Sequence, residues 1–311
     1  MTTAVAVTLY NGERFIYEQL ESLRNQTMAP DRVVLCDDGS KDRTAQIVET
    51  YIDEHALADW WIFIRNEQNL GYIKNFYKAI SLCGTDLIYL CDQDDIWKEN
   101  KIEKMTQVME QRSDISLLSC RYGIVEAQGA VQHSVVEKEF REDGQIRCVD
   151  VQEIMRAYRW PGMLMCLRKT FFDSICDKIC ECDVAHDFML AVLAADTNAF
   201  WEYNYVGAFH RRHDNNTARE EHRVSKLLNM ERKLTDISIT KKLWKTFLEA
   251  DMPLQKTNRD LMEKRLACLN ERETALKNKS LSSILKLYTG NSGKMLRLNS
   301  FLCDIWLVLF G

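Results

Sequence analysis

Short apolar runs alternate with helical patterns over the first 110 residues. The runs have the length and the β-branched or aromatic composition of buried strands. They are "AVAVTL" (4–9), "RVVLC" (32–36), "WIFI" (61–64) and "LIYLC" (87–91). Between them, apolar residues recur three or four positions apart, as in Ile16, Leu20 and Leu23, which is typical of one buried helix face. The alternation predicts βαβ units and a parallel sheet with helices on both sides.

The rest of the chain is less regular and then becomes helical. "DISLLSC" (114–120) and "AFWEYN" (199–204) resemble strands, and "HDFMLAVLAA" (186–195) has a helical pattern. After residue 217 the composition shifts to Lys, Glu, Leu and Asn, with amphipathic patterns at about 222–250 and 254–279. We therefore predict an α/β domain (1–217) with a parallel sheet flanked by helices. A basic amphipathic α-helical extension (218–311) follows it.

Polar side chains follow the end of each predicted strand. Right-handed crossovers place the carboxyl ends of parallel strands on one edge of the sheet, where ligands of such folds bind. We expect these side chains to collect there. They are Thr8 and Tyr10 after the first strand, Asp37 and Asp38 after the second, Asn69, Lys74 and Asn75 after the third, and Asp92, Asp94 and Asp95 after the fourth.

The three aspartates of "CDQDD" concentrate negative charge where packing alone does not require it. Like charges at close range raise one another's pKa, so a positive partner is missing from the sequence. Mg²⁺ or Mn²⁺ prefers oxygen ligands and often binds one or two carboxylates together with substrate phosphates. One interpretation is a divalent ion that holds a diphosphate. The other is that the aspartates cap a helix that starts near Trp97.

The motif "CDDGSKDRT" carries a second acidic pair. Asp37 or Asp38 can accept a hydrogen bond from a nucleobase N–H. An ordinary strand–turn–helix junction would explain Gly39 and Ser40, but not both aspartates. No G-x-G-x-x-G and no Walker loop is found, which argues against a dinucleotide-binding or P-loop enzyme.

Composition and charge are those of a globular protein with a basic C-terminal part. The net charge is −5, yet residues 219–311 carry 18 Lys or Arg against 11 Asp or Glu, a balance of +7. This balance suits an anionic neighbour such as phospholipid headgroups, or ordinary solvated helix faces. The last stretch, 283–310, mixes apolar and basic residues, and its apolar end is too short to span a bilayer. It can lie in a membrane interface or pack on the body of the protein.

The cysteines indicate a reducing compartment, and neither they nor most of the histidines form a recognisable site. The eleven cysteines are odd in number and scattered, and the first residues lack the features of a signal peptide, so we expect a cytoplasmic protein. Cys176, Cys180, Cys182 and His186 match no common zinc spacing. Three further histidines suggest no partner: His55, His210 and His222.

The order of the motifs is more specific than any one of them. "TLYNGERFIYEQLESLRNQT", "CDDGSKDRT", "NLGYIKNFYKAI", "YLCDQDDIWKENKI", "HDFMLAVLA" and "HRRHDNNT" together resemble the glycosyltransferase 2 family, most closely its rhamnosyltransferase branch, over about residues 4–217. The resemblance implies a GT-A fold, whose Rossmann-like sheet is mixed but mostly parallel. It also implies an inverting, metal-dependent transfer of a sugar from a nucleotide donor. It assigns nucleotide binding to residues 1–110, and the acceptor and catalysis to 111–217.

The resemblance also implies a set of residues that bind the nucleotide sugar. These are Thr8, Tyr10 and Glu13 in the nucleotide pocket, Asp37 and Asp38 at the base, Lys74 and Asn75 near the donor, Asp92 at the ribose or sugar, and Arg211 at phosphate.

A second implied set carries the chemistry. Asp94, with Asp95, would bind Mg²⁺ or Mn²⁺, and His213 would approach the metal or the diphosphate. Asp187 matches the catalytic base that deprotonates the acceptor hydroxyl; the alternative is a simple helix N-cap. Asp214 stands where the family pattern usually has glycine, which leaves the shape of that loop open.

We therefore expect an inverting hexosyltransferase for a cell-surface glycan. The donor would be dTDP-L-rhamnose or a UDP-sugar, and the acceptor a lipid-linked or polysaccharide glycan. The enzyme would lie peripherally on the inner face of the plasma membrane through its C-terminal helices. It would bind no nucleic acid, and a homodimer is one option for its oligomeric state. One alternative is a sugar-nucleotide pyrophosphorylase, whose glycine-rich opening is absent from "TLYNGE". Another alternative is an inactive nucleotide-sugar binding module. The presence of both Asp94 and Asp187 argues against it, because an inactive relative could lose either residue.

Overall fold

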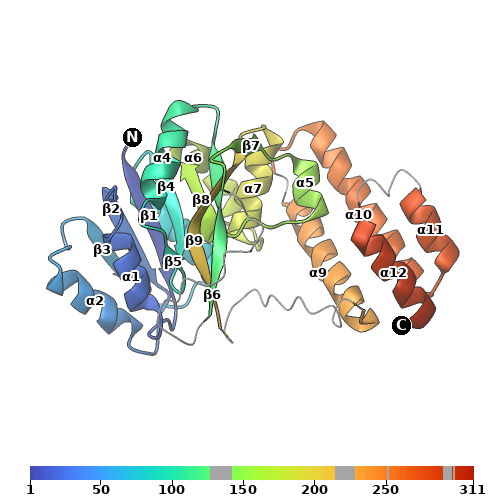
Figure 1. Ribbon diagram of the computed structural model, residues 1–311, viewed down its shortest axis with the longest axis horizontal. Helices are drawn as coiled ribbons and strands as arrows, with labels where there is room; N and C mark the ends of the chain where they lie inside the picture. The colour runs from blue at the N-terminus through green and yellow to red at the C-terminus, as the bar shows by residue number, and fades with distance from the viewer. Residues whose placement is uncertain (127–141, 214–227, 251, 290–295, 297) are drawn as a thin grey trace. The chain divides into compact units, whose positions relative to one another are not determined.

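The computed structural model describes residues 1–126, 142–213, 228–250, 252–289, 296 and 298–311 (Figure 1). The chain divides into two compact units. The first comprises Met1–Val149, Trp160–Glu181 and Ala185–Asn215, and the second Asp150–Arg159, Cys182–Val184 and Asn216–Gly311. The predicted boundary at 217, the predicted helix start near 222 and Asp214 fall outside the described residues. The domain boundaries therefore stay predictions.

The first unit is built on one mixed sheet. Its strands are β1 (Thr3–Leu9), β2 (Arg32–Asp37), β3 (Trp61–Arg65), β4 (Leu87–Asp92), β5 (Ile96–Trp97), β6 (Leu117–Glu126), β7 (Ile146–Cys148), β8 (Met165–Arg168) and β9 (Phe200–Arg212). They run in the order β3-β2-β1-β4-β8-β6-β9-β5, and β7 pairs with β9 off this path. The first four strands pair in parallel, β8 is antiparallel to both neighbours, and β6 and β9 are parallel. The predicted α/β fold with a mixed sheet is confirmed.

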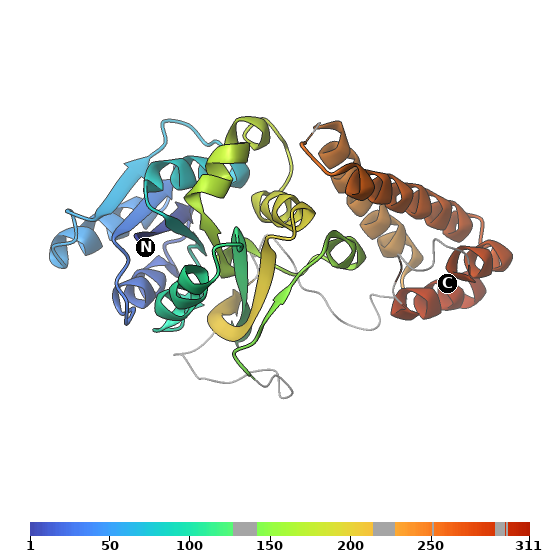
Figure 2. The same ribbon diagram turned by 90° about the horizontal axis from the view of Figure 1, so that it is seen from above.

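Helices cover both faces of this sheet (Figures 1 and 2). The helices are α1 (Ile16–Arg24), α2 (Thr44–Glu54), α3 (Tyr72–Cys83), α4 (Lys101–Gln111), α6 (Lys169–Ile179) and α7 (His186–Asp196), with a short 3₁₀ helix η1 (Gly162–Leu164). Side chains of α1, α2 and α4 share one core cluster with one face of β1, β2 and β4. On the opposite face, α3 contacts α6 through Tyr77 and Phe172, and α7 through Phe76 and His186.

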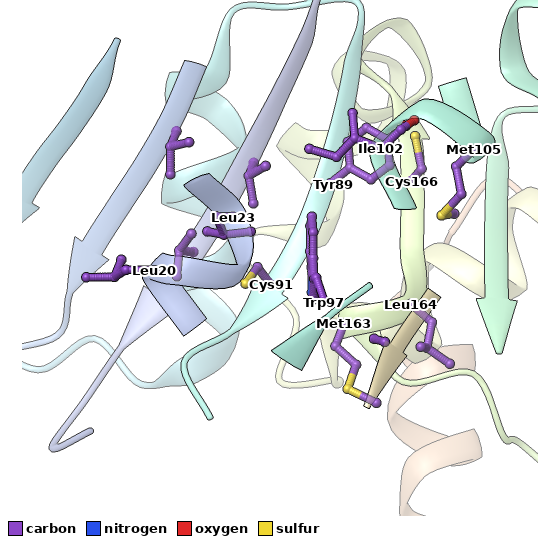
Figure 3. Packing of buried hydrophobic residues seen from close by; sticks show 14 of the residues in the cluster. Leu20, Leu23, Tyr89, Cys91, Trp97, Ile102, Met105, Met163, Leu164 and Cys166 are labelled. Carbon is purple, nitrogen blue, oxygen red and sulfur yellow. The ribbon is translucent and has the colours of Figure 1, made fainter. Parts of the chain in front are cut away.

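The core beneath the end of β4 is packed around aromatic side chains. Tyr89 is fully buried; its hydroxyl donates to the carbonyl of Ile102 at 3.0 Å and lies 2.8 Å from Thr106 Oγ1. Trp97 lies next to Tyr89, with ring centroids 6.1 Å apart (Figure 3). Buried apolar contacts of this kind are close-packed and resist local movement. They give the loop between β4 and β5 a rigid base.

Two expectations from the sequence need correction here. No helix starts near Trp97, because Ile96 and Trp97 form β5 and pair with Ala208 and Phe209 of β9; α4 begins only at Lys101. The last strand does not end at residue 204 but continues to Arg212, since β6 and β5 supply hydrogen-bonding partners along its length. The extension carries His210 and Arg211 toward the β4–β5 loop.

The second unit is helical, as predicted for the C-terminal part. It contains α5 (Val151–Arg156), α9 (Met230–Glu249), α10 (Lys256–Lys277), α11 (Leu281–Thr289) and α12 (Leu298–Phe310). A buried ion pair joins α10 to α12: Arg272 donates from Nε and Nη2 to Asp304 at 2.6 and 2.8 Å, and Tyr288 adds a hydrogen bond at 2.9 Å. Among the described helices, none has both the length and the apolar character needed to cross a membrane.

Three loops at the carboxyl edge of the sheet are joined by side chains. Asn11 N donates to Ser40 Oγ at 2.9 Å, and Asn11 Oδ1 accepts from Lys41 N at 2.8 Å. Gln93 pairs with both backbone groups of Tyr10, each at 2.9 Å. The acidic β4–β5 loop is therefore fastened to the loop after β1.

Gly12 leaves the space that this fastening needs. A Cβ at Gly12 would lie 2.2 Å from Gln93 Oε1, so Gly12→Ala must displace the amide and break both of its bonds to Tyr10. We expect the free energy of unfolding, measured in urea, to fall by about 1–3 kcal/mol, the value of two hydrogen bonds. In a Gln93→Ala background the same change should cost less. Equal costs in the two backgrounds would contradict this role of Gly12.

Candidate active site

The ends of β1, β2 and β4 lie side by side, as the alternation of strands and helices predicts. Thr8 pairs in register with Cys36 on one side and with Asp92 on the other. Thr8 and Asp92 are half-buried, and Tyr10, just past β1, is 49% exposed. Glu13 lies in the next turn, where its carboxylate accepts from the backbone N–H of Arg43 at 3.1 Å.

The end of β9 holds the acidic β4–β5 loop in place. His213 Nε2 lies 2.8 Å from Asp94 Oδ2, and His210 Nδ1 lies 3.0 Å from Asp95 Oδ1. The backbone N–H of Arg211 also donates to Asp95 Oδ1 at 3.3 Å. Asp94 and His213, which the family resemblance assigns to the metal, are therefore neighbours. His210 had no predicted partner, and its place on the long β9 supplies one.

Arg211 is held between the acidic loop and α1, and its expected contact with phosphate stays a prediction. Its side chain is 3% exposed, because this position of β9 points inward. The guanidinium binds the carboxylate of Glu18 and donates from Nε to the carbonyl of Asp94 at 3.1 Å. It also lies over the ring of Phe15. Arg211 thus braces the acidic loop from α1.

The electrostatics of the loop show a shortage of positive charge. Burial raises the pKa of Asp92 well above its usual value, and the carboxylates of Asp95, Asp94 and Asp187 raise it further, while Lys101 lowers it. Burial also raises the pKa of Asp95, which the hydrogen bond from His210 opposes. Asp95 Oδ2 is buried and has no hydrogen-bond partner among the described residues. A carboxylate oxygen left in this state is costly unless a cation binds nearby.

Asp94 and His213 fit a divalent ion as a partial set of ligands. Neighbouring ligands on an octahedral ion, each about 2.1 Å from it, stand about 3 Å apart. Asp94 Oδ2 and His213 Nε2 have nearly this spacing at 2.8 Å. Within the described chain, no three His, Cys, Asp or Glu side chains form a group that can hold a metal. Such an ion would therefore need phosphate or water oxygens as its remaining ligands, which is usual for Mg²⁺.

Asp187 lies within electrostatic reach of this loop, since its charge contributes to the raised pKa of Asp92. It is half-buried and is the second residue of α7. One of its oxygens accepts from the backbone N–H of Phe188 at 2.7 Å. Ala185, not Asp187, occupies the N-cap position. Asp187 is thus an anion in the first turn of a helix, where the helix dipole favours the ionised form.

Asp37 and Asp38 are buried and shape the loops around them. Asp37 accepts from the N–H and the hydroxyl of Ser40. Asp38 accepts from the N–H groups of Leu70 and Gly71 at 2.7 and 2.9 Å. Hydrogen bonds to nearby loops therefore explain the presence of both aspartates. The sequence alone did not suggest this structural role. A contact with a nucleobase stays a prediction.

Lys74 and Asn75 point in different directions from α3. Lys74 is exposed, whereas Asn75 is 1% exposed. The Asn75 amide donates to the carbonyl of Cys36 at 2.9 Å and accepts from Asn66 at the same distance. Asn75 therefore joins α3 to β2 inside the core, and its expected place beside the donor stays a prediction.

One further charged residue near the site escaped sequence reasoning. Lys101 is fully buried, and its ammonium donates to the carbonyl of Met163 at 2.6 Å and lies 3.3 Å from the centroid of the Trp97 ring. Burial lowers its pKa, which the charge of Asp95 opposes. The only signal in the sequence is a lysine at an apolar position of the α4 pattern, before Ile102 and Met105.

Two solved structures with the same fold contain a bound nucleotide sugar. TarS 1–349 of S. aureus in complex with UDP-GlcNAc matches with a TM-score of 0.60 at 17% identity, over 93% of this chain and 79% of that one. The mannosyltransferase PcManGT from Pyrobaculum calidifontis, in complex with GDP-Man and Mn²⁺, matches with a TM-score of 0.50 at 14% identity, over 99% and 86%. At these identities the likeness shows the fold, and the predicted GT-A architecture with C-terminal helices is confirmed.

Comparison of sequences identifies the family. Glycosyltransferase GlyG of Streptococcus pneumoniae serotype 4 is 28% identical over 158 residues, 49% of this chain and 48% of that protein. Putative glycosyltransferase EpsH of Bacillus subtilis is 32% identical over 121 residues, 38% of this chain and 33% of that protein. The chain thus spans half the length of these relatives or less. The sequence model of Glycosyl transferase family 2 matches residues 4–172, more than half of the chain. The chain therefore belongs to glycosyl transferase family 2.

Proposed function

We propose that this protein is an inverting, metal-dependent glycosyltransferase that moves a sugar from a nucleotide diphosphate to a hydroxyl acceptor. One observation carries the proposal: burial and neighbouring carboxylates raise the pKa of Asp92, Asp95 Oδ2 is buried with no hydrogen-bond partner among the described residues, and Asp187 lies within electrostatic reach of Asp92. The aspartates of the acidic loop would bind a cation and, through it, a diphosphate. Asp187 would be the base that takes the proton. Membership of family 2 supports the same reaction.

In this mechanism Asp187 takes the proton of the acceptor hydroxyl as its oxygen attacks the anomeric carbon. Attack comes from the face opposite the leaving group, so a single displacement inverts the configuration. Asp94 and His213, with Asp95 behind them, would hold Mg²⁺ or Mn²⁺, which when bound supplies positive charge beside the departing diphosphate. Asp92 would contact the ribose or the sugar.

The nucleotide would lie along the ends of β1 and β2. Thr8, Tyr10 and Glu13 would line its pocket, with Asp37 and Asp38 at the base. Lys74, exposed on α3, is placed to meet the donor. The resemblance to the rhamnosyltransferase branch favours dTDP-L-rhamnose, while the nucleotides bound to TarS and PcManGT keep UDP- and GDP-sugars as candidates.

The raised pKa of Asp92 distinguishes this proposal from its alternatives. A binding module without catalysis has no use for a carboxylate like Asp187 that adds to the repulsion in the acidic loop. A pyrophosphorylase would need a glycine-rich phosphate loop after β1, where Tyr10 and Asn11 stand instead. Transfer to a hydroxyl therefore accounts best for the arrangement.

The outer face of α12 supports peripheral membrane association. Large apolar side chains recur along it: Leu298 (70% exposed), Leu302 (57%), Trp306 (38%) and Leu309 (52%). A helix with such a face lies in a membrane interface, and the +7 balance of residues 219–311 suits anionic headgroups. No disulfide joins any of the eleven cysteines. A place on the inner face of the plasma membrane, near a lipid-linked glycan acceptor, fits these features.

Replacing Asp187 with Asn tests the assignment of the base. We expect kcat of transfer to fall by about 10³-fold, the scale of general-base catalysis, while the Kd of the nucleoside diphosphate changes little. Asp173→Asn, at an exposed carboxylate on α6, is the matched control. Loss of nucleotide binding in Asp187→Asn would assign this residue to structure instead.

Removing the metal tests the role of the acidic loop. In isothermal titration calorimetry with UDP or dTDP, EDTA should weaken binding at least about tenfold, and Mn²⁺ should restore it. Asp94→Asn should weaken Mn²⁺ binding itself by at least 10- to 100-fold, because even the partners of metal ligands contribute about this much. Asp114→Asn, an exposed partner of Arg112, should behave as the wild type. Full affinity for nucleotide in EDTA would refute the metal site.

Sedimentation with vesicles tests the face of α12. The double variant Leu302→Ser/Trp306→Ser should bind phosphatidylglycerol vesicles at least about tenfold more weakly, because it removes two large apolar side chains from the membrane. Ile239→Ser, at a residue of α9 that is 62% exposed, is the matched control. Unchanged sedimentation, or a wild-type dimer that the double variant splits into monomers, would contradict membrane binding.

A further inference from the structure

A buried histidine stands directly before the proposed base. His186 is the first residue of α7 and is 5% exposed. Neither ring nitrogen has a hydrogen-bond partner among the described residues. A neutral imidazole carries one N–H donor and one acceptor nitrogen, so both of its hydrogen-bonding groups are buried unsatisfied. The free-energy cost of burying both groups is therefore larger than that of leaving one hydrogen bond unmade.

The ring is held firmly by its neighbours. It stacks on Phe76 of α3, with centroids 3.9 Å apart and an interplanar angle of 24°. Tyr72 meets it edge-on at 6.2 Å. Burial lowers the pKa of His186 to about 3, so the ring is neutral at physiological pH. Its orientation is thus set by packing and not by charge.

Gly162 of η1 makes room for one of the two nitrogens. A Cβ at this position would lie 2.6 Å from His186 Nε2, closer than any side chain allows. The histidine edge therefore rests against backbone. Packing does not require nitrogens here, because a phenylalanine has nearly the same shape and would stack on Phe76 without unsatisfied groups. The two nitrogens therefore lower the stability of the fold, because they form no hydrogen bond within the described residues.

The position of the ring suggests what they bind. His186 contacts α3, which follows the loop of Leu70 and Gly71 held by Asp38 at the proposed donor edge. It also adjoins Asp187, which must approach the anomeric carbon during transfer. In the proposed mechanism the anomeric carbon of the transferred sugar is attacked beside Asp187, so the sugar would lie near the start of α7, where His186 stands.

We propose that His186 is a specificity-determining residue that hydrogen-bonds, as a neutral imidazole, to a hydroxyl of the transferred sugar. This inference rests on the proposed function and deepens it. A hydroxyl can either donate to or accept from a ring nitrogen, so it suits either tautomer of a neutral imidazole. A diphosphate would instead call for a cationic partner. Buried polar groups that are satisfied only by the correct substrate discriminate strongly against analogues that lack the matching group.

The test compares His186→Phe, which keeps the stacking, with His186→Gln, which keeps a donor and an acceptor. Calorimetry uses three pairs of probes, each a nucleoside diphosphate and its sugar: dTDP and dTDP-L-rhamnose, UDP and UDP-GlcNAc, GDP and GDP-mannose. For the sugar nucleotide that the wild type binds best, His186→Phe should raise Kd about tenfold, the value of one hydrogen bond. The Kd of the matching nucleoside diphosphate should change less than twofold, and His186→Gln should recover part of the loss.

The melting temperature provides a second readout, because a histidine with only a structural role would not combine a higher Tm with weaker sugar binding when replaced. His186→Phe should raise Tm, because it removes two unsatisfied buried groups, while it weakens sugar recognition. His55→Phe is the matched control: His55 also stacks on an aromatic ring, that of Tyr51 at 4.5 Å, and should leave both Kd values unchanged.

Three outcomes would overturn the proposal for His186 alone. They are unchanged binding of the sugar nucleotide in His186→Phe, equal losses for the nucleotide with and without sugar, and a higher KM for the acceptor with donor binding intact. If the wild type binds none of the six probes, the proposed function fails, and this inference fails with it.

Discussion

The arrangement of the active site depends on holding like charges together at the end of a buried strand. Asp92, Asp94 and Asp95 follow β4 directly, where a low-dielectric surrounding strengthens their mutual repulsion. The end of β9 compensates part of this, through His210 and His213. The compensation is incomplete, because the pKa of Asp92 remains raised. In the proposed function this arrangement would be organised in advance for a cation and the diphosphate that accompanies it.

Keeping such a loop in shape requires contacts from distant parts of the chain. Gln93 fastens it to the backbone of Tyr10, and Arg211 braces it from Glu18 of α1. Below it, Lys101 ties α4 to the segment at Met163. The contacts of Arg211 and Lys101 are half-buried and buried, so solvent screens them little, whereas the two hydrogen bonds of Gln93 are exposed. The loop therefore keeps its conformation without relying on a bound ligand.

The same site contains groups that reduce stability. Asp95 Oδ2 and both nitrogens of His186 are buried without hydrogen-bond partners in the described chain. Natural proteins accept such costs mainly where function needs the group, since an apolar side chain of the same shape would be more stable. Asp95 lies in the acidic loop and His186 beside the proposed base, while other such atoms, including Gln19 Oε1 and Trp201 Nε1, lie elsewhere in the described chain.

The sequence alone was enough to predict the elements and the acidic motif. The runs at 4–9, 32–36, 61–64 and 87–91 are strands because short β-branched and aromatic segments are stable only when buried in a sheet. The alternation with helices then requires parallel pairing, which brings Thr8 beside Asp92. Asp187 at the start of a helix was also visible, from the apolar pattern that follows it. All of these depend on residues near one another in the chain.

Only the tertiary structure decided which partners these residues have. β5 exists because Ile96 and Trp97 meet β9, more than a hundred residues away in sequence, and this pairing delays the start of α4 to Lys101. Once β9 extends to Arg212, its alternation turns Arg211 inward and brings His210 to Asp95. Asn75 likewise points into the core because α3 packs on β2. Periodicity in a sequence shows that a face is buried, but its partner is set by long-range packing, which leaves no local signal.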